Sequence, residues 1–189
     1  MSKAAVILIP LVIIGVLVVG AFGIYNGLVS AHEEAKTAWA QVENQYQRRA
    51  DLIPNLVETV KGFAQQEKGV LEEVTRLRSQ WGEARQAGDM NKSLQAAQGL
   101  DGALSRLMVV VERYPDLKSN QNFMKLQDQL EGTENRISVE RKRFNDSVFN
   151  YNRKIRTFPG VLFAGLFGFE RMPLFEAEPE AKKAPKVKF

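Results

Sequence analysis

The chain opens with an unbroken apolar run. Residues 4–24 contain no charged side chain, and nearly all of them are Val, Ile, Leu, Ala, Gly or Phe. At about 1.5 Å of rise per residue they make roughly 30 Å of helix, which matches the hydrocarbon core of a bilayer. The pattern predicts an N-terminal transmembrane anchor over residues 1–26. A cleaved signal peptide is the alternative, although its apolar core is usually only about 7–15 residues long.

After this run the apolar positions recur at alternating spacings of three and four residues. From Trp39 to Trp81 they form a heptad seam, which is typical of long helices that pack through one face. Similar stripes follow in residues 94–114 and 123–158, and no alternating strand pattern interrupts them. The sequence therefore predicts an all-α fold, in which the transmembrane helix is followed by an antiparallel four-helix bundle with long helices.

Pro54 lies in the middle of the seam. Proline lacks an N–H group and disfavours helical angles in the residue before it, so it usually begins a new helix. We therefore expect helices over residues 27–50 and 54–86, with one long kinked helix as the alternative. A turn is expected at residues 86–93, and Ser119 is expected to cap the last helix, which would continue to residue 158.

Composition removes most catalytic chemistry. The 189 residues include no cysteine and a single histidine, which excludes disulfides, thiolate metal sites and iron–sulfur clusters and disfavours a Ser-His-Asp triad. The formal net charge of +4 is mild and gives no concentrated basic face of the kind that nucleic acids need. We expect no enzymatic activity, catalytic residue, cofactor or metal, and no nucleic-acid partner.

Several polar residues occupy positions that a helix core usually fills with apolar side chains. Arg49 and Glu67 lie in the seam itself. In the last helix, spacings of seven, four and seven place four polar residues on one face beside the apolar stripe, namely Glu134, Arg141, Asn145 and Asn152. The favoured interpretation is a polar network that fixes helix register, and the alternative is a docking or catalytic site.

A short segment after the last helix is rich in Phe and Gly. Residues 159–169 are uncharged, too few to span a bilayer and too apolar to face water. The candidate contact residues are Phe158, Pro159, Phe163, Phe167 and Phe169. The segment could cap its own bundle, enter a membrane interface or pack on a neighbouring subunit. Because Trp and Tyr are absent from it, burial by protein is favoured over lipid.

Three blocks of the sequence resemble the LemA family. They are Arg48-Arg49-Ala50-Asp51-Leu52-Ile53-Pro54-Asn55-Leu56-Val57 with Val60-Lys61-Gly62-Phe63, then Glu134-Asn135 through Arg141, Phe144-Asn145 and Tyr151-Asn152, and finally Leu166-Phe167-Gly168-Phe169 with Phe175-Glu176. The resemblance implies a membrane segment, a helical-bundle body and no established enzymatic activity. It also implies a scaffold or accessory protein, often linked to membrane proteases and envelope maintenance.

Together these observations predict four regions: an anchor (1–26), a helical bundle (27–158), an apolar segment (159–175) and a charged flexible tail (176–189). The longest helix must project beyond its neighbours or lean on another molecule, which makes a homo-oligomer a hypothesis. The expected protein is a self-associating or partner-docking scaffold in the bacterial inner membrane, with the bilayer as one partner. Alternatives are an accessory subunit of a membrane protease and a membrane-remodelling protein. Lys3 before the span favours a cytoplasmic N-terminus and a body outside the cytoplasm.

Overall fold

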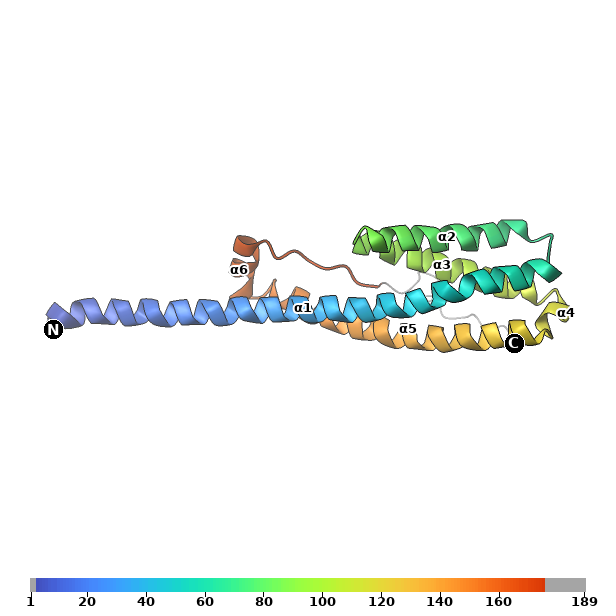
Figure 1. Cartoon of the computed structure of the whole chain (residues 1–189). Helices are drawn as coiled ribbons and strands as arrows, with labels where there is room; N and C mark the ends of the chain where they lie inside the picture. Colours follow the sequence, from blue (N-terminus) through green and yellow to red (C-terminus); the bar gives the residue numbers. More distant parts are fainter. Residues whose placement is uncertain (1–2, 176–189) are drawn as a thin grey trace, which may run out of the picture. The chain divides into compact units, whose positions relative to one another are not determined.

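The computed structural model describes residues 3–175, with side chains from residue 8 onward. The described part contains helices and no strand. In chain order the helices are α1 (Lys3–Phe63), α2 (Lys68–Gln86), α3 (Met90–Val111), α4 (Pro115–Lys118), α5 (Gln121–Lys154) and α6 (Gly160–Phe167) (Figure 1). The all-α fold with a long apolar N-terminal helix is confirmed. The predicted charged tail, residues 176–189, lies outside the described residues.

The chain divides into two compact units. Of the described residues, one unit comprises 3–38 and 143–174, and we call it the anchor unit. The other comprises 39–142 and 175, and we call it the bundle unit. Helices α1 and α5 each contribute residues to both units.

The bundle unit contains an apolar core to which four long helices contribute. Its buried members include Ile53, Leu56 and Val60 of α1, Leu71, Val74 and Leu77 of α2, Leu100, Leu104 and Leu107 of α3, and Phe123 and Leu130 of α5. Helices α2 and α3 pack against each other as a hairpin (Figure 1). The spacings of three, four and seven within each set place these side chains on one helix face, which explains why they meet in one core. The predicted four-helix bundle is confirmed in this unit.

The predicted helix boundary at Pro54 is wrong. Helix α1 passes through this residue and ends at Phe63, and the chain turns at residues 64–67 before α2 begins. Proline removes the hydrogen bond to the carbonyl four residues earlier, which belongs to Ala50. Here the Ala50 carbonyl accepts a hydrogen bond from Arg78 Nε of α2 at 2.8 Å. The lost intrahelical bond is thus replaced by one from a neighbouring helix, and Pro54 itself is exposed.

The other boundaries follow the turn signals more closely. Helix α2 ends at Gln86 as predicted, and Gly88 adopts a left-handed φ of 67° in the turn. The cap of α5 is Asn120 rather than the predicted Ser119, because the Asn120 side chain accepts from the backbone N–H groups of residues 122 and 123 at 2.9 and 3.1 Å. Helix α5 ends at Lys154, four residues before the predicted end.

The anchor unit combines the apolar part of α1 with the end of α5 and with α6. Residues 8–20 of α1 are exposed, and the helix is long and apolar enough to cross a membrane. Beyond them a small core forms from Leu28, Ala31, Tyr151, Ile155 and Ala164. At Gly160 a Cβ atom would lie 2.2 Å from the Lys154 carbonyl oxygen, so only glycine permits this close approach of α6 to the end of α5.

Candidate functional site

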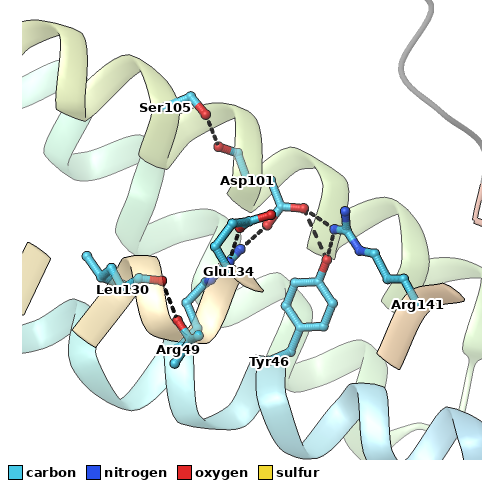
Figure 2. A network of polar contacts seen from close by, with 8 residues as sticks. Tyr46, Arg49, Asp101, Ser105, Leu130, Glu134 and Arg141 are labelled. Atoms are coloured by element: carbon cyan, nitrogen blue, oxygen red, sulfur yellow. Dashed lines mark hydrogen bonds and ion pairs between the residues drawn. The ribbon is translucent and has the colours of Figure 1, made fainter. Parts of the chain in front are cut away.

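A network of charged side chains lies inside the bundle unit, and Arg49 is at its centre (Figure 2). The Arg49 side chain of α1 is only 3% exposed. Its two terminal nitrogens donate to different carboxylates, one to Asp101 of α3 and the other to Glu134 of α5. One guanidinium group therefore connects three helices.

Asp101 is the acceptor that the network shares. Its side chain is 16% exposed, and it accepts from Arg49, from Arg141 of α5 and from the Tyr46 hydroxyl, the last at 3.0 Å. Arg141 also donates to the Tyr46 oxygen. Figure 2 shows the Asp101 carboxylate facing both arginines, with the Tyr46 hydroxyl linked to both Asp101 and Arg141. Two cations thus share one nearly buried anion, and Glu134, which is 53% exposed, supplies the second negative charge.

Aromatic rings line the same site. The Arg141 guanidinium carbon lies 4.9 Å from the Phe175 ring centroid and 5.4 Å from that of Tyr46. Phe175 in turn contacts Trp39, with ring centroids 5.9 Å apart. The negative ring faces favour a nearby cation, so these contacts hold Arg141 in place beside Asp101.

Glu67, the second charged residue of the predicted seam, belongs to a separate contact. It accepts from Arg113 at 2.9 Å and from the Tyr114 hydroxyl at 3.1 Å. Burial and the neighbouring Glu67 carboxylate raise the pKa of Tyr114, since both disfavour the phenolate. Arg49 and Glu67 do not pair with each other, and each is neutralised by residues that follow it in the chain.

The four polar residues of α5 are divided between the two units. Glu134 and Arg141 join the network of the bundle unit, whereas Asn145 and Asn152 belong to the anchor unit. The Asn152 amide donates to the Met172 carbonyl at 2.9 Å and accepts from the Met172 N–H at 3.0 Å. Asn152 therefore fixes the backbone that follows α6.

Tyr151, beside Asn152, supports the same backbone. Its hydroxyl donates to the Glu170 carbonyl at 2.7 Å. Burial raises the pKa of Tyr151, with a smaller contribution from the charge of Glu170. The neutral phenol, which is the form that can donate, is thus favoured at this position.

The Phe/Gly-rich segment is buried on one side only. Helix α6 turns Gly160 and Ala164 toward the small core of the anchor unit, with Phe163 and Phe169 packed at its margin. Phe167 reaches Tyr25 of α1, with ring centroids 4.9 Å apart. Phe158, next to Pro159, is 80% exposed. The segment therefore packs on its own chain through one face, and its other face is open.

Sequence reasoning missed several residues that make the contacts of the bundle unit, among them Asp101, Tyr46 and Arg78. Asp101 follows Leu100 and precedes Leu104 by three positions, so it lies on the core-facing side of its helix, and a charge there was a usable signal. Tyr46 was assigned only to the apolar seam, and nothing in the pattern marked its hydroxyl. No pattern in the sequence marked Arg78, because it donates to the backbone carbonyl of Ala50 rather than to a charged side chain.

The chemistry of the network is that of an ion-pair cluster. Its carboxylates are engaged by arginines, and its hydroxyl is bonded to Asp101 and Arg141. Within residues 3–175 no three His, Cys, Asp or Glu side chains are grouped so that they could hold a metal ion. The arrangement can fix three helices in one register, as buried ion pairs do in other helical proteins.

Several known proteins are similar to this chain in sequence. The chain is 29% identical over 178 residues to magnetosome protein MamQ of Magnetospirillum gryphiswaldense, and the match covers 82% of this chain. Magnetosome protein MamQ 2 of Paramagnetospirillum magneticum matches to the same extent. The chain spans 65% of the length of these relatives. Protein LemA of Metamycoplasma hominis is 22% identical, and the match covers 93% of this chain and 80% of that protein.

The profile of the LemA family matches residues 38–189. This range contains the whole bundle unit, α6 and the residues of the ion network. With the apolar stretch of α1, the match identifies a membrane-associated helical protein. The chain belongs to the LemA family.

Proposed function

We propose that this protein is a non-enzymatic, single-pass membrane protein whose helical body serves as a self-associating scaffold and docks partners at the bacterial cell envelope. The observation that carries the proposal is the Arg49 network. It joins α1, α3 and α5 around Arg49 and Asp101, whose side chains are only 3% and 16% exposed. Buried ion pairs are a costly way to gain stability, but they select one arrangement of helices over its alternatives.

A body in one fixed arrangement suits binding. A surface that is already ordered loses less conformational entropy when a partner docks, so more of the contact energy appears as affinity. The resemblance of the chain to proteins named for the magnetosome is consistent with a role beside a membrane. We propose that this protein resides in the bacterial inner membrane.

Self-association is tested by the particle mass of the full chain in detergent. Light scattering coupled to gel filtration is expected to give a protein mass of two or more 21.3 kDa chains. Asp101→Asn, which weakens the network, is expected to reduce the multimer fraction, whereas Glu134→Gln at the half-exposed carboxylate is expected to retain it. A single monomer mass for the natural chain, with no cross-linked copy in cell membranes, contradicts self-association.

The proposed orientation places the N-terminus in the cytoplasm and the body outside it, because Lys3 precedes the span and Lys36 is the only Lys or Arg in the following twenty residues. The chain has no cysteine, so a single Val109→Cys variant gives one unambiguous label in the bundle unit. A membrane-impermeant thiol reagent added to spheroplasts is expected to react with it. If the label reacts only after the membrane is opened, the body lies in the cytoplasm and the proposed orientation is wrong.

A further inference from the structure

The outer face of α6 is an unusual surface for a helix that packs on its own chain. Its large apolar side chains remain exposed: Leu162 by 63%, Leu166 by 76% and Phe167 by 52%. Phe158, at the start of the segment, is exposed by 80%. Leu162 and Leu166 are four residues apart, so they lie in one row along α6, and Phe158 lies in the turn before the helix. An exposed group of large apolar side chains of this kind marks a place of interaction.

The position of α6 along α1 indicates what that surface meets. The Phe167 and Phe169 rings lie 4.9 and 6.0 Å from the ring of Tyr25. Tyr25 directly follows the apolar run of α1, and tyrosine is enriched where membrane helices leave the hydrocarbon. In the anchor unit, α6 therefore lies beside the end of the apolar run, where the lipid headgroups begin if residues 4–24 span the bilayer.

Three arginines lie in the segments that flank α6 in the chain. Arg153, Arg156 and Arg171 line a cavity of about 400 Å³ together with Asn152, Thr157 and the exposed side chains of Phe149 and Leu174. Among residues 3–175, none of the three arginines forms an ion pair with a carboxylate. Lys154 also lies beside the end of the apolar run of α1. Its ammonium group is 3.4 Å from the carbonyl oxygen of Gly27, two residues after Tyr25.

We propose that α6 and the adjacent arginines form a docking surface for an anionic phospholipid bilayer. Phe158 and the row of Leu162 and Leu166 enter the boundary between headgroups and acyl chains, and Arg153, Arg156 and Arg171 hold lipid phosphates. Helices that lie in a membrane interface have this composition, with an apolar face and a cationic margin. Arginine suits the phosphate because its planar group donates two hydrogen bonds at once.

This inference rests on the membrane anchor of the proposed function, so the experiment measures both. The full chain is labelled with a nitroxide at one introduced cysteine and reconstituted into vesicles of phosphatidylcholine and phosphatidylglycerol. The variants are Leu166→Cys in α6, Val16→Cys in the apolar run and Val109→Cys in α3. The three natural side chains are exposed to a similar degree, by 76%, 66% and 71%.

Collision rates with oxygen, which concentrates in lipid, and with a water-soluble nickel chelate report the surroundings of each label. We expect the ratio of oxygen to chelate collisions at residue 166 to exceed the ratio at residue 109 several-fold and to approach that at residue 16. Equal ratios at 166 and 109, with residue 16 in lipid, overturn the inference and leave the anchor intact. A label at 166 shielded from both reagents indicates a second copy of the chain and also overturns it. A water-exposed residue 16 overturns the anchor itself.

The proposed role of the arginines is tested by measuring which lipid lies near α6. A fluorophore on Phe158→Cys is quenched by brominated phosphatidylglycerol or brominated phosphatidylcholine at the same mole fraction in vesicles that contain both lipids. We expect quenching by the anionic lipid to be at least twofold stronger, and Arg153→Gln, Arg156→Gln and Arg171→Gln together to abolish the excess.

A triple control removes the same number of charges from the bundle unit, at Lys125→Gln, Arg136→Gln and Lys142→Gln, all of which are exposed. It is expected to keep the excess of quenching by the anionic lipid. Equal quenching by both lipids in the natural chain, or the same loss in the control, overturns the assignment of the arginines to lipid phosphates.

Discussion

The bundle unit and the anchor unit use different interactions to hold their helices. The bundle unit combines a network of two arginines and two carboxylates with an apolar core to which four long helices contribute. The anchor unit has a core cluster that includes Leu28, Tyr151 and Ala164, and its Tyr151 and Asn152 side chains bond to backbone groups. Charged side chains join helices in one unit, and polar side chains hold the main chain that follows α6 in the other.

The difference follows from where each unit can place its apolar side chains. The bundle unit buries nearly all of its seam, as expected for a body that is surrounded by water. The anchor unit leaves residues 8–20 and one face of α6 uncovered. A surface of that kind is stable beside lipid, which provides the apolar surroundings that the chain itself does not.

The largest expected effect comes from removing the shared anion of the bundle unit. Asp101→Asn removes the carboxylate that Arg49 and Arg141 share, while Glu134 still pairs with Arg49. The expected loss is therefore about 3 kcal/mol of unfolding free energy, at the lower end of the range for a broken buried pair. Urea unfolding followed by circular dichroism in detergent measures the loss. Glu134→Gln, at a carboxylate that is 53% exposed, is expected to cost less than about 1 kcal/mol. Equal losses in the two variants contradict a central role for Asp101.

The next effect tests why α1 continues through Pro54. Arg78→Met removes the donor to the Ala50 carbonyl, and a hydrogen bond from a charged group is worth about 1.5–3 kcal/mol. In a Pro54→Ala background, the carbonyl regains an N–H partner within α1, so the same substitution is expected to cost less than about 1 kcal/mol. The exposed Arg76→Met, which loses only a contact to Gln80, is the control. An Arg78 effect that is unchanged in the Pro54→Ala background contradicts the compensation.

A substitution in the anchor unit is expected to have a local effect on stability. Asn152→Ala removes both hydrogen bonds to Met172, which are worth about 1 kcal/mol each. Hydrogen exchange of the Met172 amide is expected to accelerate by about ten- to thirtyfold, while exchange in α2 and α3 stays the same. The exposed neighbour Asn150→Ala should leave the Met172 amide unchanged. Faster exchange throughout the bundle unit contradicts the local role of Asn152.

The sequence predicted the helices better than their ends and contacts. A heptad seam from Trp39 to Trp81 indicates which side chains are buried, and the structure buries Val42, Ile53, Leu56 and Val74 as expected. It does not indicate where the chain turns, because the seam keeps its phase through both Pro54 and the real break at residues 64–67. The Ala50 carbonyl, which Pro54 leaves without a partner within α1, accepts from Arg78. These two residues are 28 positions apart, so the periodicity of one helix does not show the contact.

Only part of the candidate site could be predicted, because its contacts also join residues that are far apart in the sequence. Arg49, Glu134 and Arg141 stood out because charges interrupt or flank apolar stripes. Their pairing depends on which helices are neighbours in the bundle, and periodicity within one helix does not carry that information. Asp101 completes the network from α3, a helix that the sequence analysis treated only as an apolar face.

The smallest expected effect concerns Glu43, a partly buried carboxyl of the bundle unit outside the ion network. Burial raises its pKa, and the opposing influences of Arg85 and of a hydrogen bond with Trp39 are smaller. A carboxyl whose pKa is raised by folding binds its proton more tightly in the native state, so its contribution to stability is complete in acid below the unfolded pKa and is lost as the pH rises through the folded pKa. Glu43→Gln is therefore expected to match the natural chain in acid and to be more stable than it at neutral pH. Melting temperatures of both proteins measured from acid to neutral pH test this, and a variant less stable at neutral pH would show that Arg85 outweighs burial at this position.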